Sequence, residues 1–94
     1  MEKRFTAALL NAADQCKRLG YNPSYFLRMV SGKGGVATAK QLINSPTISD
    51  GFARLWEMKC LGLTVEAIAV QPELKELFTS EELAAAERRL DEFG

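Results

Sequence analysis

The chain has 94 residues, of which 47% are hydrophobic and 26% are charged, and it contains no histidine. This length supports one modest hydrophobic core, so we expect a single domain over residues 1–94. The ordinary composition excludes a disordered or fibrous chain. Without histidine, the commonest general base at neutral pH and a usual zinc ligand are both missing. We therefore expect a protein that is not an enzyme and that uses no metal and no cofactor.

The cysteines and the N-terminal segment indicate the compartment. Cys16 and Cys60 form no CxxC pair, so buried, reduced thiols are the simplest interpretation. The segment Met1–Arg18 carries charges on both sides of a short apolar run, unlike a secretory signal. No apolar stretch reaches the roughly 18 residues that a membrane-spanning helix needs. We expect a cytoplasmic protein with no membrane partner.

The net charge is zero, but the charges are unevenly distributed along the chain. Residues 1–60 carry nine cations and four carboxylates, a formal charge of +5. Residues 61–94 carry three cations and eight carboxylates, a formal charge of −5. The basic part is suited to phosphate or to an acidic partner. Alternatively, the acidic part folds back onto the basic part and neutralises it.

Apolar residues recur at helical spacing in the first half of the chain. They predict a first helix of about 17 residues that ends at Gly20, a residue suited to the left-handed position after a helix. Asn22-Pro23 reads as a cap followed by a favoured first helical residue, and this second helix ends at Ser31-Gly32. After Gly34-Gly35 a third helix runs to about Asn44.

A fourth helix is predicted after a cap at Ser49 or Asp50. Its end is placed at Gly62, because glycine commonly terminates helices. The residues expected on its buried side recur at helical spacing and are Phe52, Leu55, Trp56 and Cys60.

The last third of the chain predicts two further helices. Thr64 caps a short helix that Pro72 interrupts. Thr79 and Glu82 match a capping box, in which each residue bonds the backbone of the other, and they open a final helix. We therefore expect an all-α fold, a compact bundle of five to six short helices.

The glycine-rich turn between the second and third helices is the most suggestive motif. Glycines at a helix start let backbone N–H groups approach an anion, and Lys33 and Lys40 add positive charge nearby. A nucleotide-binding loop is excluded, because it needs a preceding strand and the G-x-x-x-x-G-K-[ST] frame. A helix-hairpin-helix of the DNA-repair kind fits poorly, since Lys33 stands where that motif has an apolar residue. A third interpretation is a tight turn that needs glycine for steric reasons.

Aromatic residues and arginines suggest a contact surface. Tyr21, Tyr25 and Arg28 belong to the residue types that dominate protein interfaces and base-stacking surfaces. Tyr25 beside Arg28 is the better candidate for exposure, whereas Trp56 is expected in the core.

Four segments of the chain, YNPSYFLRMV, GGVATAKQLI, GFARLWEMKCLGLTVEAIAV and LFTSEELAAAERRL, carry a family resemblance. They resemble an uncharacterised bacterial all-helical module found alone or as a C-terminal extension of larger, often restriction- or nuclease-associated proteins. The resemblance covers most of residues 9–94. It implies an accessory domain in a bacterial defence or mobile-element context, and it brings no site residues.

Two functional hypotheses follow. The first is a non-catalytic binding module, associated with nucleic acid, that uses a basic surface around the glycine-rich turn. The alternative is a protein–protein interaction domain or a small phage-type inhibitor that binds a host protein. The sequence leaves the oligomeric state open. The candidate binding residues are Tyr25, Arg28, Lys33, Gly34, Gly35, Lys40 and Arg54.

Overall fold

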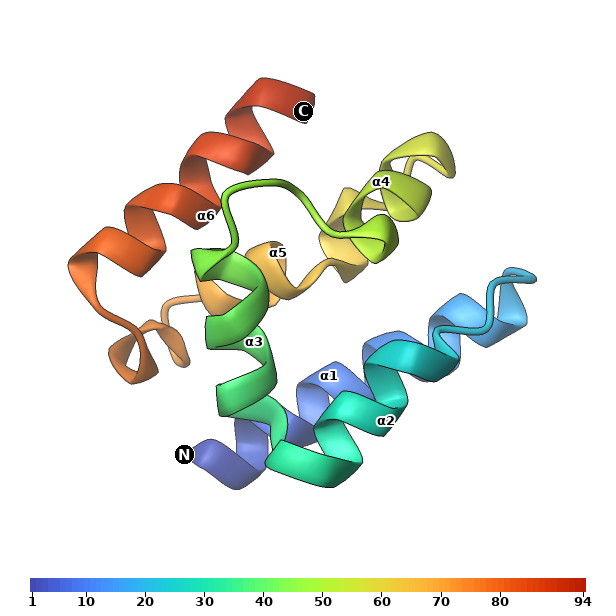
Figure 1. The fold of residues 1–94 in the computed structure, drawn as a ribbon, viewed down its shortest axis with the longest axis horizontal. Coiled ribbons are helices and arrows are strands. Elements are labelled where there is room, and N and C mark those ends of the chain that lie inside the picture. The colour runs from blue at the N-terminus through green and yellow to red at the C-terminus, as the bar shows by residue number, and fades with distance from the viewer.

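A computed structural model describes all of residues 1–94, and it contains helices and no strands (Figure 1). The prediction of an all-α bundle of five to six short helices is confirmed. Two single turns of 3-10 helix, η1 (Leu61–Leu63) and η2 (Lys75–Leu77), lie on either side of the fifth helix. The α-helices are α1 (Glu2–Arg18), α2 (Ser24–Lys33), α3 (Gly35–Asn44), α4 (Asp50–Glu57), α5 (Val65–Ala69) and α6 (Ser80–Phe93). None of them is both long and apolar enough to cross a membrane.

Helices α3 and α5 lie at the centre of the bundle, where each packs against the other and against α1 and α6 (Figure 1). Helix α2 folds back along α1, and α3 leaves the far end of α2 at a steep angle. Helix α3 contacts α1, α2, α5 and α6, and α5, the shortest α-helix, contacts α1, α3 and α6. The segment between α3 and α4 arches from one side of the molecule to the other.

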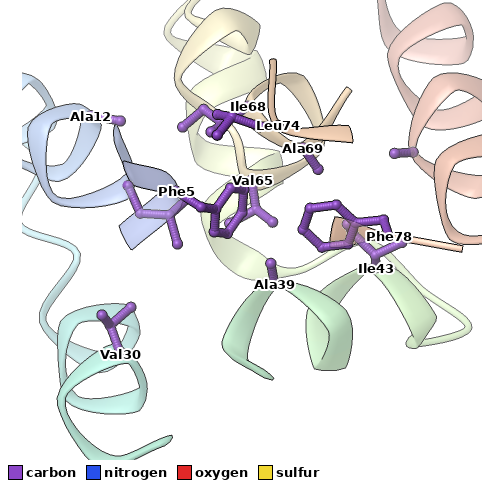
Figure 2. Packing of buried hydrophobic residues seen from close by; sticks show 12 residues of the cluster. Phe5, Ala12, Val30, Ala39, Ile43, Val65, Ile68, Ala69, Leu74 and Phe78 are labelled. Atoms are coloured by element: carbon purple, nitrogen blue, oxygen red, sulfur yellow. The ribbon is translucent and has the colours of Figure 1, made fainter. Parts of the chain in front are cut away.

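One cluster of twelve buried side chains forms the core (Figure 2). Phe5 of α1 and Phe78 meet edge to face with ring centroids 5.2 Å apart, a geometry that aromatic pairs favour. Ala39 and Ile43 of α3 approach these rings from one side, as Figure 2 shows. The amphipathic stripes of five helices therefore converge on one apolar centre.

The ends of α1 and α4 use the same hydrogen-bonded motif. At α1 the Tyr21 amide donates to the Cys16 carbonyl over 2.9 Å, and Gly20 has φ +94° as predicted. At α4 the Cys60 amide donates to the Leu55 carbonyl over 2.7 Å, and Lys59 has φ +61°. These are Schellman-type caps. The predicted end of α4 at Gly62 is wrong, because Lys59 adopts the left-handed conformation three residues earlier.

The start of α2 and the exposure of Trp56 also differ from the prediction. Helix α2 begins at Ser24 with Pro23 at the cap position, and Asn22 makes no capping hydrogen bond. The helix also continues past Ser31-Gly32 to Lys33. Trp56 is 47% exposed and meets the Phe93 ring edge to face, with ring centroids 5.5 Å apart.

The other predicted helix caps are confirmed. The Ser49 side chain accepts from the Phe52 amide, and the Thr64 side chain accepts from the Ala67 amide. Thr79 and the residue three positions later form the complete capping box at α6. Local sequence signals therefore determine where α4, α5 and α6 begin.

Buried polar contacts fasten α6 to the rest of the bundle. The Arg89 guanidinium lies 3.0 Å from the Glu66 carboxylate of α5, and both side chains are largely shielded from solvent. Arg89 also donates to the backbone carbonyls of Leu42 and Ser45 at the end of α3. A single arginine thus joins three helices, because it satisfies carbonyl groups that a helix end leaves without partners.

The glycine-rich turn is built on two different steric requirements. Gly34 has φ +90° and ψ 164°, a conformation that side-chain-bearing residues rarely adopt. Gly35 is buried, and a Cβ atom added there would lie 2.5 Å from the Thr6 hydroxyl and 3.1 Å from the Thr6 Cα. Glycine at this position therefore lets α3 approach α1 closely.

We expect Gly35→Ala to lower the free energy of unfolding by about 1–3 kcal/mol, the usual cost of overpacking a tight contact. Gly32→Ala is the matched control, since Gly32 is helical and exposed and has no atom within 4 Å of an added Cβ. It should be neutral or stabilising by about 0.5–1 kcal/mol. Urea denaturation followed by circular dichroism measures both. Equal effects of the two substitutions would contradict the close-approach role of Gly35.

Candidate functional site

Two of the sequence-predicted site residues form a pair on the outer face of α2. The Arg28 guanidinium carbon lies 5.9 Å from the centroid of the Tyr25 ring. Tyr25 is 67% exposed, the largest exposure among the bulky hydrophobic side chains of the chain. The predicted exposure of Tyr25 is confirmed, and the pair has the geometry of a cation–π contact.

Arg54 makes a second arginine–tyrosine pair. It projects from α4, and its guanidinium carbon lies 5.8 Å from the centroid of the Tyr21 ring. Tyr21 belongs to the α1–α2 connection, next to the start of the helix that carries Tyr25. Neither Arg28 nor Arg54 lies within ion-pair distance of a carboxylate.

The two predicted lysines make contacts within the fold. Lys33 donates to the Gln41 side chain, and Lys40 lies 2.7 Å from Glu82 of α6. The amide of Asn44 donates to the same carboxylate over 2.8 Å. At Lys40, therefore, the acidic C-terminal part folds back onto the basic part.

Glu82 is held as a carboxylate by these contacts. Burial alone would raise its pKa, but hydrogen bonds from Lys40, the Thr79 amide and Asn44 lower the pKa to about 2. Because Lys40 forms an ion pair with this buried carboxylate, the positive charge of Lys40 is already neutralised within the protein.

The predicted site residues lie in three separate places, one of which is Lys40 with its partner Glu82. Lys33, Gly34 and Gly35 lie at one end of α2, and the backbone of both glycines has the structural role described above. Tyr25 lies eight residues earlier on α2, about 12 Å away along the helix axis. A basic surface around the glycine-rich turn stays a prediction, whereas the two arginine–tyrosine pairs lie beside a feature that the sequence did not reveal.

That feature is an apolar cleft of about 520 Å³. Helix α1 contributes Leu9 and Cys16, α2 contributes Met29, and α4 contributes Phe52 and Leu55. All five side chains are buried, so these walls of the cleft expose little surface to solvent. Its volume lies within the range of roughly 300–1,000 Å³ that is typical of ligand sites.

The mouth of the cleft is polar. It is bordered by the α1–α2 connection, with Asn22 and Ser24, and by the α3–α4 connection, with Thr47 and Ser49. Tyr21 and Tyr25 also line the cleft, and their rings make cation–π contacts with Arg54 and Arg28 respectively. An apolar interior with a few polar groups is the usual construction of a binding site.

Two titratable groups inside the cleft are held in their neutral forms. Burial raises the pKa of the Cys16 thiol, and the nearby Cys60 raises it further. Burial also raises the pKa of the Tyr21 hydroxyl, with smaller effects from Cys16, Arg54 and Asp50. A thiol with a raised pKa is a poor nucleophile, so Cys16 acts as an apolar lining residue. Neither cysteine forms a disulfide; Cys16 is buried as predicted, whereas Cys60 is only half-buried.

The cleft contains no arrangement for metal binding. No three His, Cys, Asp or Glu side chains of the chain lie close enough together to hold a metal ion. Glu66 lines the cleft, but its carboxylate is buried and paired with Arg89. The Glu66 carboxylate is therefore already paired within the fold.

Sequence reasoning missed most of the cleft because its wall combines residues from both halves of the chain. The segment Ser45–Ser49 has no helical periodicity and reads only as a loop. The composition of Tyr21, Tyr25 and Arg28 was the one signal that pointed to this part of the molecule.

Comparisons with known proteins identify no relative. No protein-family model, no curated protein and no solved structure matches the chain. The resemblance to a bacterial module with nuclease-associated members therefore stays a prediction. Contacts, burial and charge within this chain are what support the function proposed for it.

Proposed function

We propose that the protein is a non-catalytic interaction module that binds a segment of a partner protein in the apolar cleft between the α1–α2 connection and α4. The observation that carries this proposal is the cleft itself, which has buried apolar walls and exposed Tyr25 at its mouth. Interfaces depend on a few aromatic and arginine residues around an apolar pocket. A short chain segment that inserts apolar side chains suits this geometry.

Tyr25 differs from residues that stabilise the fold by packing in the core. It is absent from the core cluster and mostly exposed, although its ring is large and apolar. Its polar contact is with Arg28, a residue of the same helix that is also exposed. A partner segment that covers this pair would bury apolar area that the isolated protein leaves in water.

A cleft-filling variant tests the proposal. A Cβ atom at Gly51 would lie 3.5 Å from the Tyr21 hydroxyl and 3.8 Å from the Ser49 hydroxyl, and both of those residues line the cleft. Gly51→Leu should therefore place a side chain in the mouth without a backbone clash. We expect this variant to keep the wild-type circular dichroism spectrum and to lose partner binding by at least about tenfold, since 1.4 kcal/mol of lost contact suffices.

The probe is a phage-displayed library of random short peptides, selected on the wild-type protein. Gly32→Leu is the matched control, because it makes the same substitution at an exposed helical glycine outside the cleft. Peptides recovered on the wild type should bind Gly32→Leu and fail to bind Gly51→Leu. The proposal is wrong if no peptide is enriched, or if the enriched peptides bind both variants equally.

Nucleic-acid binding is the second candidate. It is favoured by the two arginine–tyrosine pairs, since tyrosine rings and guanidinium planes can stack on unpaired bases. The test is a titration of single-stranded and duplex DNA and RNA at two salt concentrations. Binding that depends on phosphate must weaken steeply as salt rises, and no binding at low salt would exclude this candidate.

A further inference from the structure

We infer that the cleft selects an acidic segment of a partner protein that inserts one bulky apolar side chain, with Arg28 and Arg54 attracting the carboxylates beside it. This inference rests on the proposed function and adds the chemistry of the partner. It is carried by two arginines that contact tyrosines of the cleft and have no carboxylate partner.

The two arginines beside the cleft differ from the cations that the fold pairs with buried carboxylates. Lys40 and Arg89 each meet a buried carboxylate within 3.0 Å. Arg28 and Arg54 meet only tyrosine rings, at 5.9 Å and 5.8 Å. An arginine on an aromatic ring keeps its N–H donors free at the edge of the guanidinium plane, where a carboxylate can accept two hydrogen bonds.

Two helix starts add positive potential at the same mouth. Helices α2 and α4 both begin at residues that line the cleft. Four backbone amides at these helix starts have no hydrogen-bond acceptor within the protein, namely those of Tyr25 and Phe26 in α2 and of Asp50 and Gly51 in α4. Free N–H groups at a helix start favour negative charge, so they act in the same direction as the two arginines.

The mouth also contains one negative group, which limits where a partner carboxylate can lie. Asp50 is exposed in the first turn of α4, where it balances the positive end of that helix. Arg28 and Arg54 do not line the cleft themselves but contact tyrosines that do, so two cations beside the cleft outnumber Asp50, the one unpaired carboxylate in its lining. Partner carboxylates are therefore expected near the arginines and away from Asp50.

The interior sets the second requirement. The side chains that line it are apolar and buried, as at Leu9, Met29 and Phe52. A volume of about 520 Å³ holds one large aromatic or aliphatic side chain together with the neighbouring main chain. An entirely charged peptide would leave this apolar surface unfilled, so an apolar anchor is needed for affinity.

The experiment uses the peptides recovered by phage display on the full-length protein. Among peptides that Gly51→Leu fails to bind, we expect Asp and Glu to be enriched next to a Phe, Leu or Trp anchor. The tightest one is then synthesised and titrated by fluorescence anisotropy. The double variant Arg28→Ala/Arg54→Ala should bind it about tenfold more weakly, and increased salt should weaken wild-type binding in the same direction.

A matched control removes two arginines elsewhere. Arg4 and Arg88 are exposed and have no carboxylate partner, and neither borders the cleft. Arg4→Ala/Arg88→Ala should bind the acidic peptide like the wild type. The inference is wrong if the cleft-dependent peptides are neutral or basic, or if both double variants lose affinity equally. Those two results leave the proposed function standing, whereas failure to enrich any peptide removes both.

Discussion

Replacing Arg89 with methionine is expected to lower the free energy of unfolding by about 3–5 kcal/mol. The substitution leaves the Glu66 carboxylate buried without its partner, which lies 3.0 Å away in the native protein. It also removes the donor to the Leu42 and Ser45 carbonyls at the end of α3. A small domain has roughly 5–15 kcal/mol of total stability, so this variant should be close to unfolding at 37 °C.

Urea denaturation followed by circular dichroism measures the effect. Arg88→Met is the matched control, because the neighbouring arginine is exposed and has no ion pair. It should change the stability by less than about 0.5 kcal/mol. The double variant Glu66→Leu/Arg89→Met removes both charges and should recover a large part of the loss.

The comparison of single and double variants identifies the cause. If Arg89→Met is as stable as Arg88→Met, the ion pair does not fasten α6 to α5. If the double variant recovers nothing, the loss comes from the α3 carbonyls rather than from the unpaired carboxylate. Both results are measurable even if the single variant is largely unfolded, because the double variant provides the reference.

Acidification is expected to remove stability that Glu82 contributes at neutral pH. The pKa of this carboxyl falls from an ordinary value of 4.5 to about 2 in the folded protein. A carboxyl whose folded pKa is lowered binds its proton more readily in the unfolded chain. Its contribution is therefore complete above about pH 5 and is lost as the pH falls toward 2. The difference in pKa corresponds to a contribution of up to about 3 kcal/mol.

Glu82→Gln isolates this effect from the protonation of other carboxylates. Glutamine can still serve the capping box with Thr79, but it carries no charge for Lys40. The wild type should be the more stable protein at pH 7, and its advantage should shrink between pH 5 and pH 2. Glu81→Gln is the control, since Glu81 is exposed and makes no side-chain contact with a cation. A pH-independent difference would show that Glu82 acts without its charge.

Most helix starts could be read from the sequence because they depend on neighbours within one turn. Ser49, Thr64 and Thr79 cap the helices that follow them through hydrogen bonds to residues three positions on. The stop at Gly20 is equally local. The end of α4 was misplaced because Lys59 takes a left-handed conformation that its side chain does not favour, and the sequence shows no signal for it.

The role of the glycine-rich turn depends on contacts between residues that lie far apart in the sequence. The steric need for glycine at Gly35 comes from its close approach to Thr6, and these two residues lie on different helices. Lys40 was grouped with Lys33 and Arg28 because it is basic and near in sequence, yet it faces Glu82 across the fold. The sequence showed that basic residues are close together along the chain. Only the packing of the helices decided which of them form ion pairs.

By itself the sequence determined the all-helical class, most helix boundaries and the exposed Tyr25 beside Arg28, because periodicity and capping are local properties. The tertiary structure alone decided the cleft, since its walls come from α1 to α5 and from the two connections that flank α2 and α4. It also placed Arg54 against Tyr21, 33 residues apart along the chain. The physical reason is that a cleft is the space left between elements, and that space depends on how helices pack rather than on which residues form them.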